Sequence, residues 1–149
     1  MSAIRWQWCR LQTLSHEQLY ALLSARETVF VVEQNCAYQE LDGLDLEALH
    51  LIAWADAEVA ACLRVLTPGV RIKQPALGRI MTAKAFRGCG LGRDLMTRAL
   101  QYVDEAGHDS VRVSAQTHLE KFYCSFGFEP VSEPYLEDGI PHIEMVRMK

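Results

Sequence analysis

The sequence has 149 residues, of which 50% are hydrophobic and 23% are charged, with a net charge of −4; these values are typical of one globular domain, spanning residues 1–149. It contains no apolar run of about 18 residues that could span a membrane and no signal-peptide core at its start, so we expect a cytoplasmic protein that does not bind a membrane. It also has no stripe of Lys and Arg, so we expect no binding to nucleic acid. The five cysteines and five histidines are scattered without ligand spacing, which argues against a disulfide framework and predicts no metal site.

The first half of the chain predicts a strand, a helix and a strand hairpin. Ser15, followed three residues later by Gln18, has the pattern of a capping box, which indicates where the helix begins. Apolar residues at helical spacing continue that helix to Phe30. In chain order we predict a strand over 4–9, this helix, a loop with a short helix over 34–47, and a hairpin of two apolar strands over 49–55 and 59–66.

An acidic segment lies between the first helix and the hairpin. Five carboxylates occur there without one Lys or Arg: Glu33, Glu40, Asp42, Asp45 and Glu47. Such a run is most often a solvated acidic surface. The alternative is an electrostatic funnel that attracts a cationic amine.

The second half of the chain alternates strands and helices. Its predicted elements are a strand over 76–81, a glycine-rich turn over 87–92, an amphipathic helix over 91–106, a strand over 111–115, a helix over 118–126, and two terminal strands, one starting at Phe128 and one over 143–148. With the first half, this order predicts an α/β (α+β) domain, in which helices cover both faces of a mixed central sheet.

The glycine-rich turn, Arg87-Gly88-Cys89-Gly90-Leu91-Gly92, stands between a strand and a helix. A turn of this kind presents unpaired backbone N–H groups and the positive end of the helix dipole, and both bind phosphate oxygens. A P-loop would need Gly-Lys-Ser/Thr, but Arg93-Asp94 follows the last glycine. A dinucleotide fingerprint fits poorly, because the next glycine is Gly107. The turn therefore predicts a phosphate-bearing ligand of a third type.

The pattern Arg-x-x-Gly-x-Gly resembles the acetyl-CoA pyrophosphate loop of the GNAT acetyltransferases. A second block, from the strand at Ser110 through Phe122-Tyr123-Cys124-Ser125-Phe126-Gly127-Phe128, resembles the GNAT element in which a strand leads to a helix carrying a tyrosine and ending in Gly-Phe. Two further stretches, 29–36 and 137–143, are similar to the small bacterial ElaA-like branch of the family. The resemblance extends from Ile4 to Met148.

This resemblance implies the GNAT acyl-CoA N-acyltransferase fold, whose two central parallel strands splay apart around the acyl-CoA. It also implies which residues bind acetyl-CoA. The backbone of the glycine turn would hold the pyrophosphate, and the preceding strand edge would pair with the pantetheine amides. The implied set is Ile80, Met81, Thr82, Arg87, Gly88, Cys89, Gly90, Leu91, Gly92, Arg93, Gln116 and Tyr123. Gln116 stands where many family members have Asn.

The resemblance places Tyr123 where the family has the tyrosine that protonates the departing thiolate. A core tyrosine beside Phe122 is the structural alternative. The base that deprotonates the amine is less clear from the sequence, with His142 and Glu33 as candidates and His118 as a weaker one. Glu33 could instead pair with Arg26, and His142 could cap a turn.

A covalent route through Cys89 or Cys124 is disfavoured, since neither lies where the acetyl group would be. The sequence thus predicts an acetyl-CoA-dependent N-acetyltransferase that acts by direct attack in a ternary complex on a small cationic amine or a protein amine. A non-catalytic acyl-CoA-binding module or sensor is the alternative, and a Rossmann-type nucleotide-binding domain is disfavoured. Many relatives dimerise, so a homodimer is compatible with the resemblance.

Overall fold

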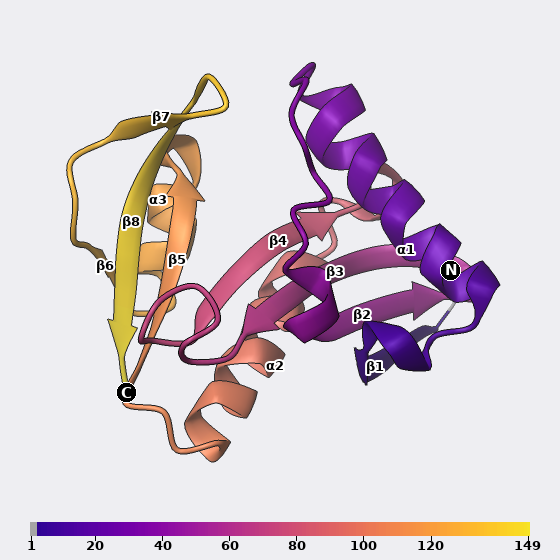
Figure 1. Ribbon diagram of the computed structural model, residues 1–149, viewed down its shortest axis with the longest axis horizontal. Coiled ribbons are helices and arrows are strands. Elements are labelled where there is room, and N and C mark those ends of the chain that lie inside the picture. Colours follow the sequence, from indigo (N-terminus) through magenta and orange to yellow (C-terminus); the bar gives the residue numbers. More distant parts are fainter. Residues whose placement is uncertain (1–2) are drawn as a thin grey trace.

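The computed structural model describes residues 3–149; Met1 and Ser2, which belong to the predicted domain, lie outside the described residues. One eight-stranded mixed sheet carries helices on both of its faces (Figure 1). Its strands follow the order β1-β2-β3-β4-β5-β8-β6, with β7 paired to β8. The elements are β1 (Ile4–Arg10), α1 (His16–Glu27), β2 (Leu49–Ala55), β3 (Glu58–Leu66), β4 (Ala76–Thr82), α2 (Leu91–Glu105), β5 (Ser110–Gln116), α3 (Glu120–Cys124), β6 (Phe128–Pro130), β7 (Tyr135–Glu137) and β8 (Ile140–Met148).

Strands β4 and β5 are the only parallel neighbours in the described sheet, and they separate soon after they meet. They pair only at Ala76↔Arg112 and Leu77↔Val113, although β4 continues to Thr82 and β5 to Gln116. Figure 1 shows the two strands diverging, with β1 to β4 in one half of the molecule and β5 to β8 in the other. The splayed parallel strands of the predicted GNAT fold are therefore present.

The two faces of the sheet are covered by different helices. Helix α1 covers one face, where Leu22 packs in a cluster with Trp54 and Met81. Helix α2 covers the opposite face of the sheet. It buries there the six apolar residues that the helical periodicity of its sequence predicts, namely Leu91, Leu95, Met96, Ala99, Leu100 and Val103. Burying an apolar stripe of this size against the sheet is the main source of the helix's stability.

Three elements differ from the sequence predictions. The α-helix that starts at Ser15 has the predicted capping box but ends at Glu27, and Thr28–Glu33 form one π-helical turn. Four of those six residues are β-branched, which lowers α-helix propensity. The helix predicted over 118–126 is a 3₁₀ turn over Thr117–Leu119 followed by the short α3. Strand β7 was not predicted, because three residues are too few for a periodic signal.

None of the helices formed by residues 3–149 is long and apolar enough to cross a membrane.

Candidate active site

The glycine turn leaves the start of α2 open to a ligand. Gly90 is the N-cap residue, with φ of +86°, and no side chain accepts from the first-turn N–H groups. A Cβ built at Gly88 or Gly90 would find no atom of residues 3–149 within 4 Å. A helix N-terminus with free N–H groups and an uncrowded approach fits the oxygens of a pyrophosphate.

Arg87 of this turn is held in place by two partners. Its Nε donates to the carbonyl of Thr82 (2.9 Å) and its Nη2 donates to Glu33 Oε2 (2.8 Å). Glu33, one of the two principal candidate bases, therefore lies beside the glycine turn. The alternative pairing of Glu33 with Arg26 is not formed, since Arg26 has other partners.

Arg93, in the first turn of α2, connects that helix to α3. Its Nη1 donates to Ser125 Oγ (3.1 Å), and its guanidinium lies 4.5 Å from the centre of the Phe126 ring. This contact fixes the glycine turn relative to the helix that carries Tyr123.

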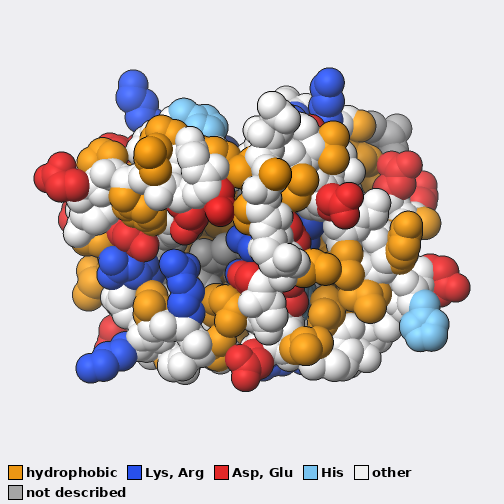
Figure 2. Space-filling model, turned by 45° about the horizontal axis from the view of Figure 1, so that its top comes forward, with side chains coloured by type: hydrophobic (Ala, Val, Ile, Leu, Met, Phe, Trp, Pro, Cys, Tyr) orange, Lys and Arg blue, Asp and Glu red, His pale blue; other side chains and the backbone are white. Residues whose placement is uncertain are grey.

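A cavity of about 440 Å³ lies between the separated strands. Figure 2 shows the molecule hollowed between its two halves, with basic and acidic side chains inside the hollow. Four of the predicted site residues line it: Ile80 of β4, Gln116 of β5, Tyr123 of α3 and His142 of β8. At the rim, Cys36 Sγ donates to the carbonyl of Asp138 (3.3 Å), which joins the two walls.

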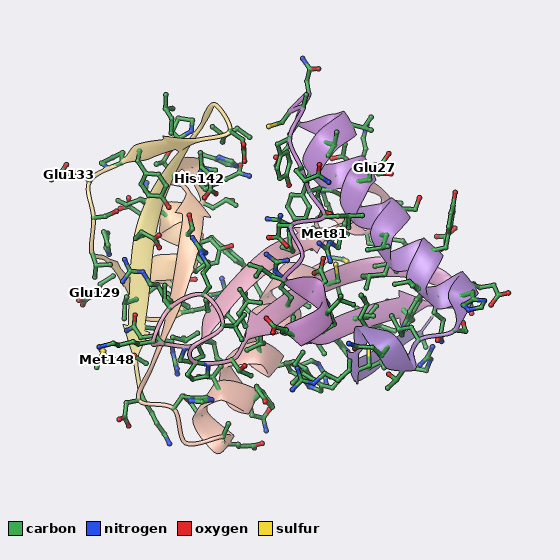
Figure 3. The ribbon with its side chains drawn as sticks, viewed as in Figure 1. Glu27, Met81, Glu129, Glu133, His142 and Met148 are labelled. Carbon is green, nitrogen blue, oxygen red and sulfur yellow. The ribbon has the colours of Figure 1, made fainter. Side chains whose placement is uncertain are left out.

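The other predicted site residues lie around this cavity without lining it. Met81 is buried under α1, on the half of the molecule that faces His142 (Figure 3). Thr82 is the last residue of β4, and residues 87–93 form the glycine turn and the start of α2. Along the chain they therefore follow the part of β4 that lines the cavity. Cys89, Cys124 and His118 are exposed and do not contribute to the lining.

Tyr123 is 4% exposed and makes edge-on contacts with Phe122 and Phe128. Burial raises the pKa of its hydroxyl well above the ordinary value, so the phenol stays protonated at neutral pH. No residue in the described part of the chain hydrogen-bonds to this hydroxyl. Tyr123 is thus a core tyrosine packed beside Phe122, which is the alternative role considered from the sequence. It also lines the cavity, and its hydroxyl has no partner in the described part of the chain, so the hydroxyl can bind a ligand.

His142 is held in one orientation by its neighbours on the β7–β8 hairpin. Its Nδ1 lies 2.7 Å from the carbonyl of Ile140, and its ring stacks on Tyr135. Because a carbonyl can only accept, Nδ1 carries the hydrogen and Nε2 is free to accept a proton. Glu137 Oε2, at 3.4 Å from Nε2, would stabilise the protonated ring.

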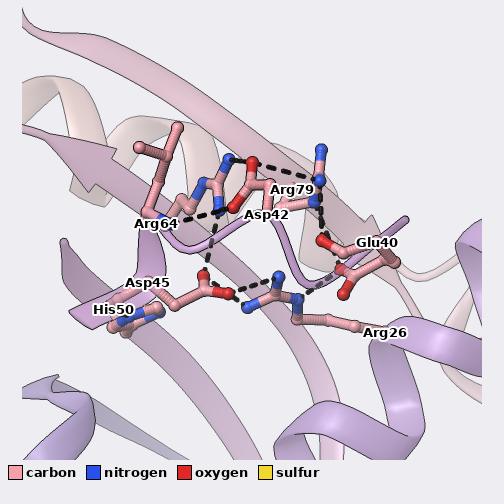
Figure 4. Close-up of polar contacts among 8 residues, drawn as sticks. Arg26, Glu40, Asp42, Asp45, His50, Arg64 and Arg79 are labelled. Carbon is pink, nitrogen blue, oxygen red and sulfur yellow. Dashed lines mark hydrogen bonds and ion pairs between the residues drawn. The ribbon is translucent and has the colours of Figure 1, made fainter. Parts of the chain in front are cut away.

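A network of three arginines and three carboxylates, four of them buried, supports the β4 wall (Figure 4). Arg26, 1% exposed, donates to Glu40 (2.7 Å) and to both oxygens of Asp45 (2.8 and 3.0 Å). Arg64 donates to both oxygens of Asp42 (2.9 and 2.6 Å) and to Asp45 (3.1 Å). Arg79 completes the network by donating to the Glu40 carbonyl (2.8 Å) and to Asp42 (3.3 Å).

The charges in this network compensate one another. Burial alone would lower the pKa of Arg26, but the hydrogen bonds to Asp45 and Glu40 outweigh it, and the net shift is upward. Burial likewise opposes ionisation of Asp42, yet the hydrogen bonds from Arg64 and from the Leu44 N–H hold the pKa of that carboxyl well below its usual range. The pKa of Asp45 is likewise lowered and that of Arg64 raised, so Arg26, Asp42, Asp45 and Arg64 stay ionised at neutral pH.

The sequence interpretations of the acidic segment hold only in part. Glu33, Asp42 and Glu47 are exposed, as a solvated surface predicts, but Glu40 and Asp45 are buried. The three central carboxylates, Glu40, Asp42 and Asp45, are neutralised by arginines instead of forming a funnel for cations. A signal for this was present in the sequence: Arg64 and Arg79 interrupt apolar strands, and an arginine inside a buried strand must find a partner.

Comparison with known proteins places this geometry in a family. Residues 10–149 match the family model described as "Acetyltransferase (GNAT) domain". Protein ElaA of Escherichia coli strain K12 is 45% identical over 147 residues, covering 97% of this chain and 96% of ElaA.

Solved structures agree with this comparison. The structure of an acyl-CoA N-acyltransferase from Pseudomonas aeruginosa is 48% identical with a TM-score of 0.90, over 97% of this chain and 99% of the other. The structure of Escherichia coli ElaA is 44% identical with a TM-score of 0.90, at the same two coverages.

Proposed function

This chain belongs to the GNAT acetyltransferase family, and from that premise we propose that it transfers an acetyl group from acetyl-CoA to the amine of an acceptor by direct attack in a ternary complex. The observation that carries the proposal is the separation of β4 from β5, which brings Tyr123 and His142 to one cavity. The open N-terminus of α2 follows directly after β4 and is suited to the phosphates of the donor.

Binding of the donor is assigned to the glycine turn and the β4 edge. The backbone N–H groups of residues 89–93 hold the pyrophosphate, and Arg87, fixed by Glu33, adds a positive charge beside them. The edge of β4 at residues 80–82 is unpaired on the side facing β5, so its main chain is free to pair with the pantetheine amides. Gln116 of β5 lines the cavity opposite β4, and its side-chain amide can hydrogen-bond to the pantetheine.

His142 and Tyr123, which both line the cavity, supply the proton transfers. His142 Nε2 accepts a proton from the acceptor's ammonium or attacking amine, and Glu137 stabilises the imidazolium that results. The amine nitrogen then bonds to the thioester carbonyl carbon, with a main-chain N–H near Met81 on the free edge of β4 as oxyanion donor. As the carbon–sulfur bond breaks, Tyr123 donates its proton to the sulfur. Burial raises the pKa of the Tyr123 phenol, which opposes loss of its proton, and it raises the proton affinity of the departing thiolate in the same direction, which offsets that effect.

Replacing His142 with Gln tests the role assigned to it. We expect kcat/KM at pH 7 to fall by roughly 100-fold, the effect of removing a general base, and the deficit to shrink at pH 9–10, where more of the acceptor is already neutral. The assay is thiol release from acetyl-CoA with the best acceptor from a panel of amines. His118→Gln is the matched control, since His118 was the weaker candidate base, is exposed and does not line the cavity.

A deficit below about twofold for His142→Gln, or one of equal size at every pH, would remove His142 as the base. Binding of acetyl-CoA without turnover of any amine would instead favour the alternative function, a non-catalytic acyl-CoA-binding module.

A further inference from the structure

One buried donor in the cavity wall has no acceptor within the protein. Arg64 is 4% exposed and uses Nη1 and Nη2 to bind Asp42 and Asp45, but its Nε–H has no hydrogen-bond partner among residues 3–149. Leaving a buried charged donor unpaired is costly, and native structures rarely do so without a reason. Arg64 lines the cavity, so a ligand there is in a position to supply the missing acceptor.

The residue opposite Arg64 places no side chain over this buried N–H. In the sheet register Arg64 of β3 pairs with Gly78 of β4, and directly paired residues have their side chains on the same face. Arg64 Nε is the nearest atom to a Cβ built at Gly78, at 3.7 Å. Arg64 and Gly78 both line the cavity, and Gly78 places no side chain between the cavity and this buried N–H.

The charges around the cavity are unevenly distributed. Near Arg64 the network pairs three arginines with three carboxylates, and Arg71, an exposed residue of the cavity wall without an ion pair in the described structure, adds one uncompensated positive charge. The β7–β8 hairpin contributes Glu137, Asp138 and His142 on the opposite wall. One end of the cavity thus favours an anion and the other an ammonium group.

From this arrangement we propose that the acceptor is a small amine that carries a carboxylate, namely a free amino acid, with the carboxylate on Arg64 Nε and Arg71 and the amine facing His142. This inference rests on the proposed acetyl transfer and specifies its acceptor. Gly78 and Ile80 are two residues apart on β4, on either side of Arg79, whose φ of +49° lies at an irregularity in the pairing with β3. Two residues of chain span at most about 7 Å. An α-amino acid and its hydrogen bonds can bridge such a distance between the Arg64 guanidinium and the β4 edge where the thioester would lie.

This proposal replaces the small cationic amine suggested by the acidic segment. The three carboxylates that would have attracted a polycation are already bound to arginines. The network leaves two buried Nε–H groups without a hydrogen bond among residues 3–149, on Arg64 and Arg79. Arg79 Nε lies 3.2 Å from Glu40, so a carboxylate-bearing acceptor instead uses Arg64 Nε.

The test compares each of the twenty L-amino acids with its own carboxamide as acceptor in the thiol-release assay. The two compounds share the amine and the side chain and differ only in the carboxylate. We expect at least one free amino acid to be acetylated with kcat/KM tenfold or more above that of its amide, the effect of one lost hydrogen bond to a charged group. Acetyl-CoA binding is measured on the same protein by calorimetry.

Two variants test which residues make the distinction. Gly78→Ala places a methyl group over Arg64 Nε at ordinary contact distance and at a φ that alanine accepts, so the fold should persist while the preference for the free acid over the amide falls by about tenfold. Arg71→Gln should reduce that preference by about threefold or more, because an exposed charge contributes less. Lys73→Gln, an exposed cation two residues away and outside the cavity lining, is the control and should leave the preference unchanged.

The outcomes separate this inference from the function on which it rests. Failure to bind acetyl-CoA would overturn the proposed function itself. With acetyl-CoA binding intact, turnover of amides as fast as free acids, turnover of none of the twenty amino acids, or an unchanged preference in Gly78→Ala would overturn the assignment of the acceptor alone.

Discussion

Replacing Tyr123 with Phe is expected to lower kcat by about 100-fold or more while leaving the dissociation constant of acetyl-CoA within about twofold. Loss of a positioned general acid typically costs two to four orders of magnitude in rate. The substitution removes only the hydroxyl. The ring contacts with Phe122 and Phe128 remain, and no partner within residues 3–149 is left unsatisfied. Stability should therefore change little, and the effect should appear in kcat.

Steady-state thiol release and calorimetric titration with acetyl-CoA measure the two quantities. Tyr102→Phe is the control, because Tyr102 is a partly buried tyrosine of α2 that packs on Trp8 away from the cavity. A kcat for Tyr123→Phe within twofold of the parent protein would assign Tyr123 to the core alone and exclude it as the acid.

Replacing Arg26 with Ala is expected to lower the free energy of unfolding by about 3–5 kcal/mol, the usual cost of removing one partner from a buried ion pair. The variant removes the hydrogen bond from Arg26 to Glu40, which keeps only its ion pair with Arg79, and two of the three side-chain hydrogen bonds of the buried Asp45. For a domain of this size the loss corresponds to a fall in Tm of roughly 10 °C or more. Urea denaturation followed by circular dichroism measures the free energy directly.

The matched control for this prediction is Arg112→Ala. Arg112 also forms an ion pair between strands, with Glu144 at 3.2 Å, but its side chain is 32% exposed. Partly exposed pairs of this kind contribute about 1 kcal/mol or less. If Arg26→Ala costs no more than Arg112→Ala, the network does not hold the β4 wall, and the support we assign to it is wrong.

The elements that define the fold were predictable because their signals are local. The capping box at Ser15 and Gln18 marks the start of α1, and the apolar spacing of α2 identifies all six of its buried residues. The glycine turn was recognised from its position between a strand and a helix. Each of these patterns arises from residues within one or two turns of each other.

The composition of the cavity was not predictable in the same way. Arg26, Arg64 and Arg79 come from α1, β3 and β4, and only the packing of these elements brings them to the same carboxylates. The free Nε–H of Arg64 depends further on the register that sets it opposite Gly78. Sequence spacing carries no information about such long-range pairing. The location of Glu33 beside Arg87 escaped prediction for the same reason.

The measurement that tests the central claim most directly is thermal unfolding with acetyl-CoA, CoA, NADH and ATP. At 100 times its dissociation constant a ligand adds about 2.7 kcal/mol, and we predict that acetyl-CoA and CoA alone raise Tm by several degrees. Gly90→Ala and Gly107→Ala serve as a matched pair, with φ of +86° and +83° at opposite ends of α2. Both variants should lose about 1 kcal/mol of unfolding free energy. Only Gly90→Ala should also lose most of the rise in Tm that acetyl-CoA causes. A rise with NADH or ATP only, or with no ligand, would contradict the assignment of the cleft between β4 and β5 to an acyl-CoA.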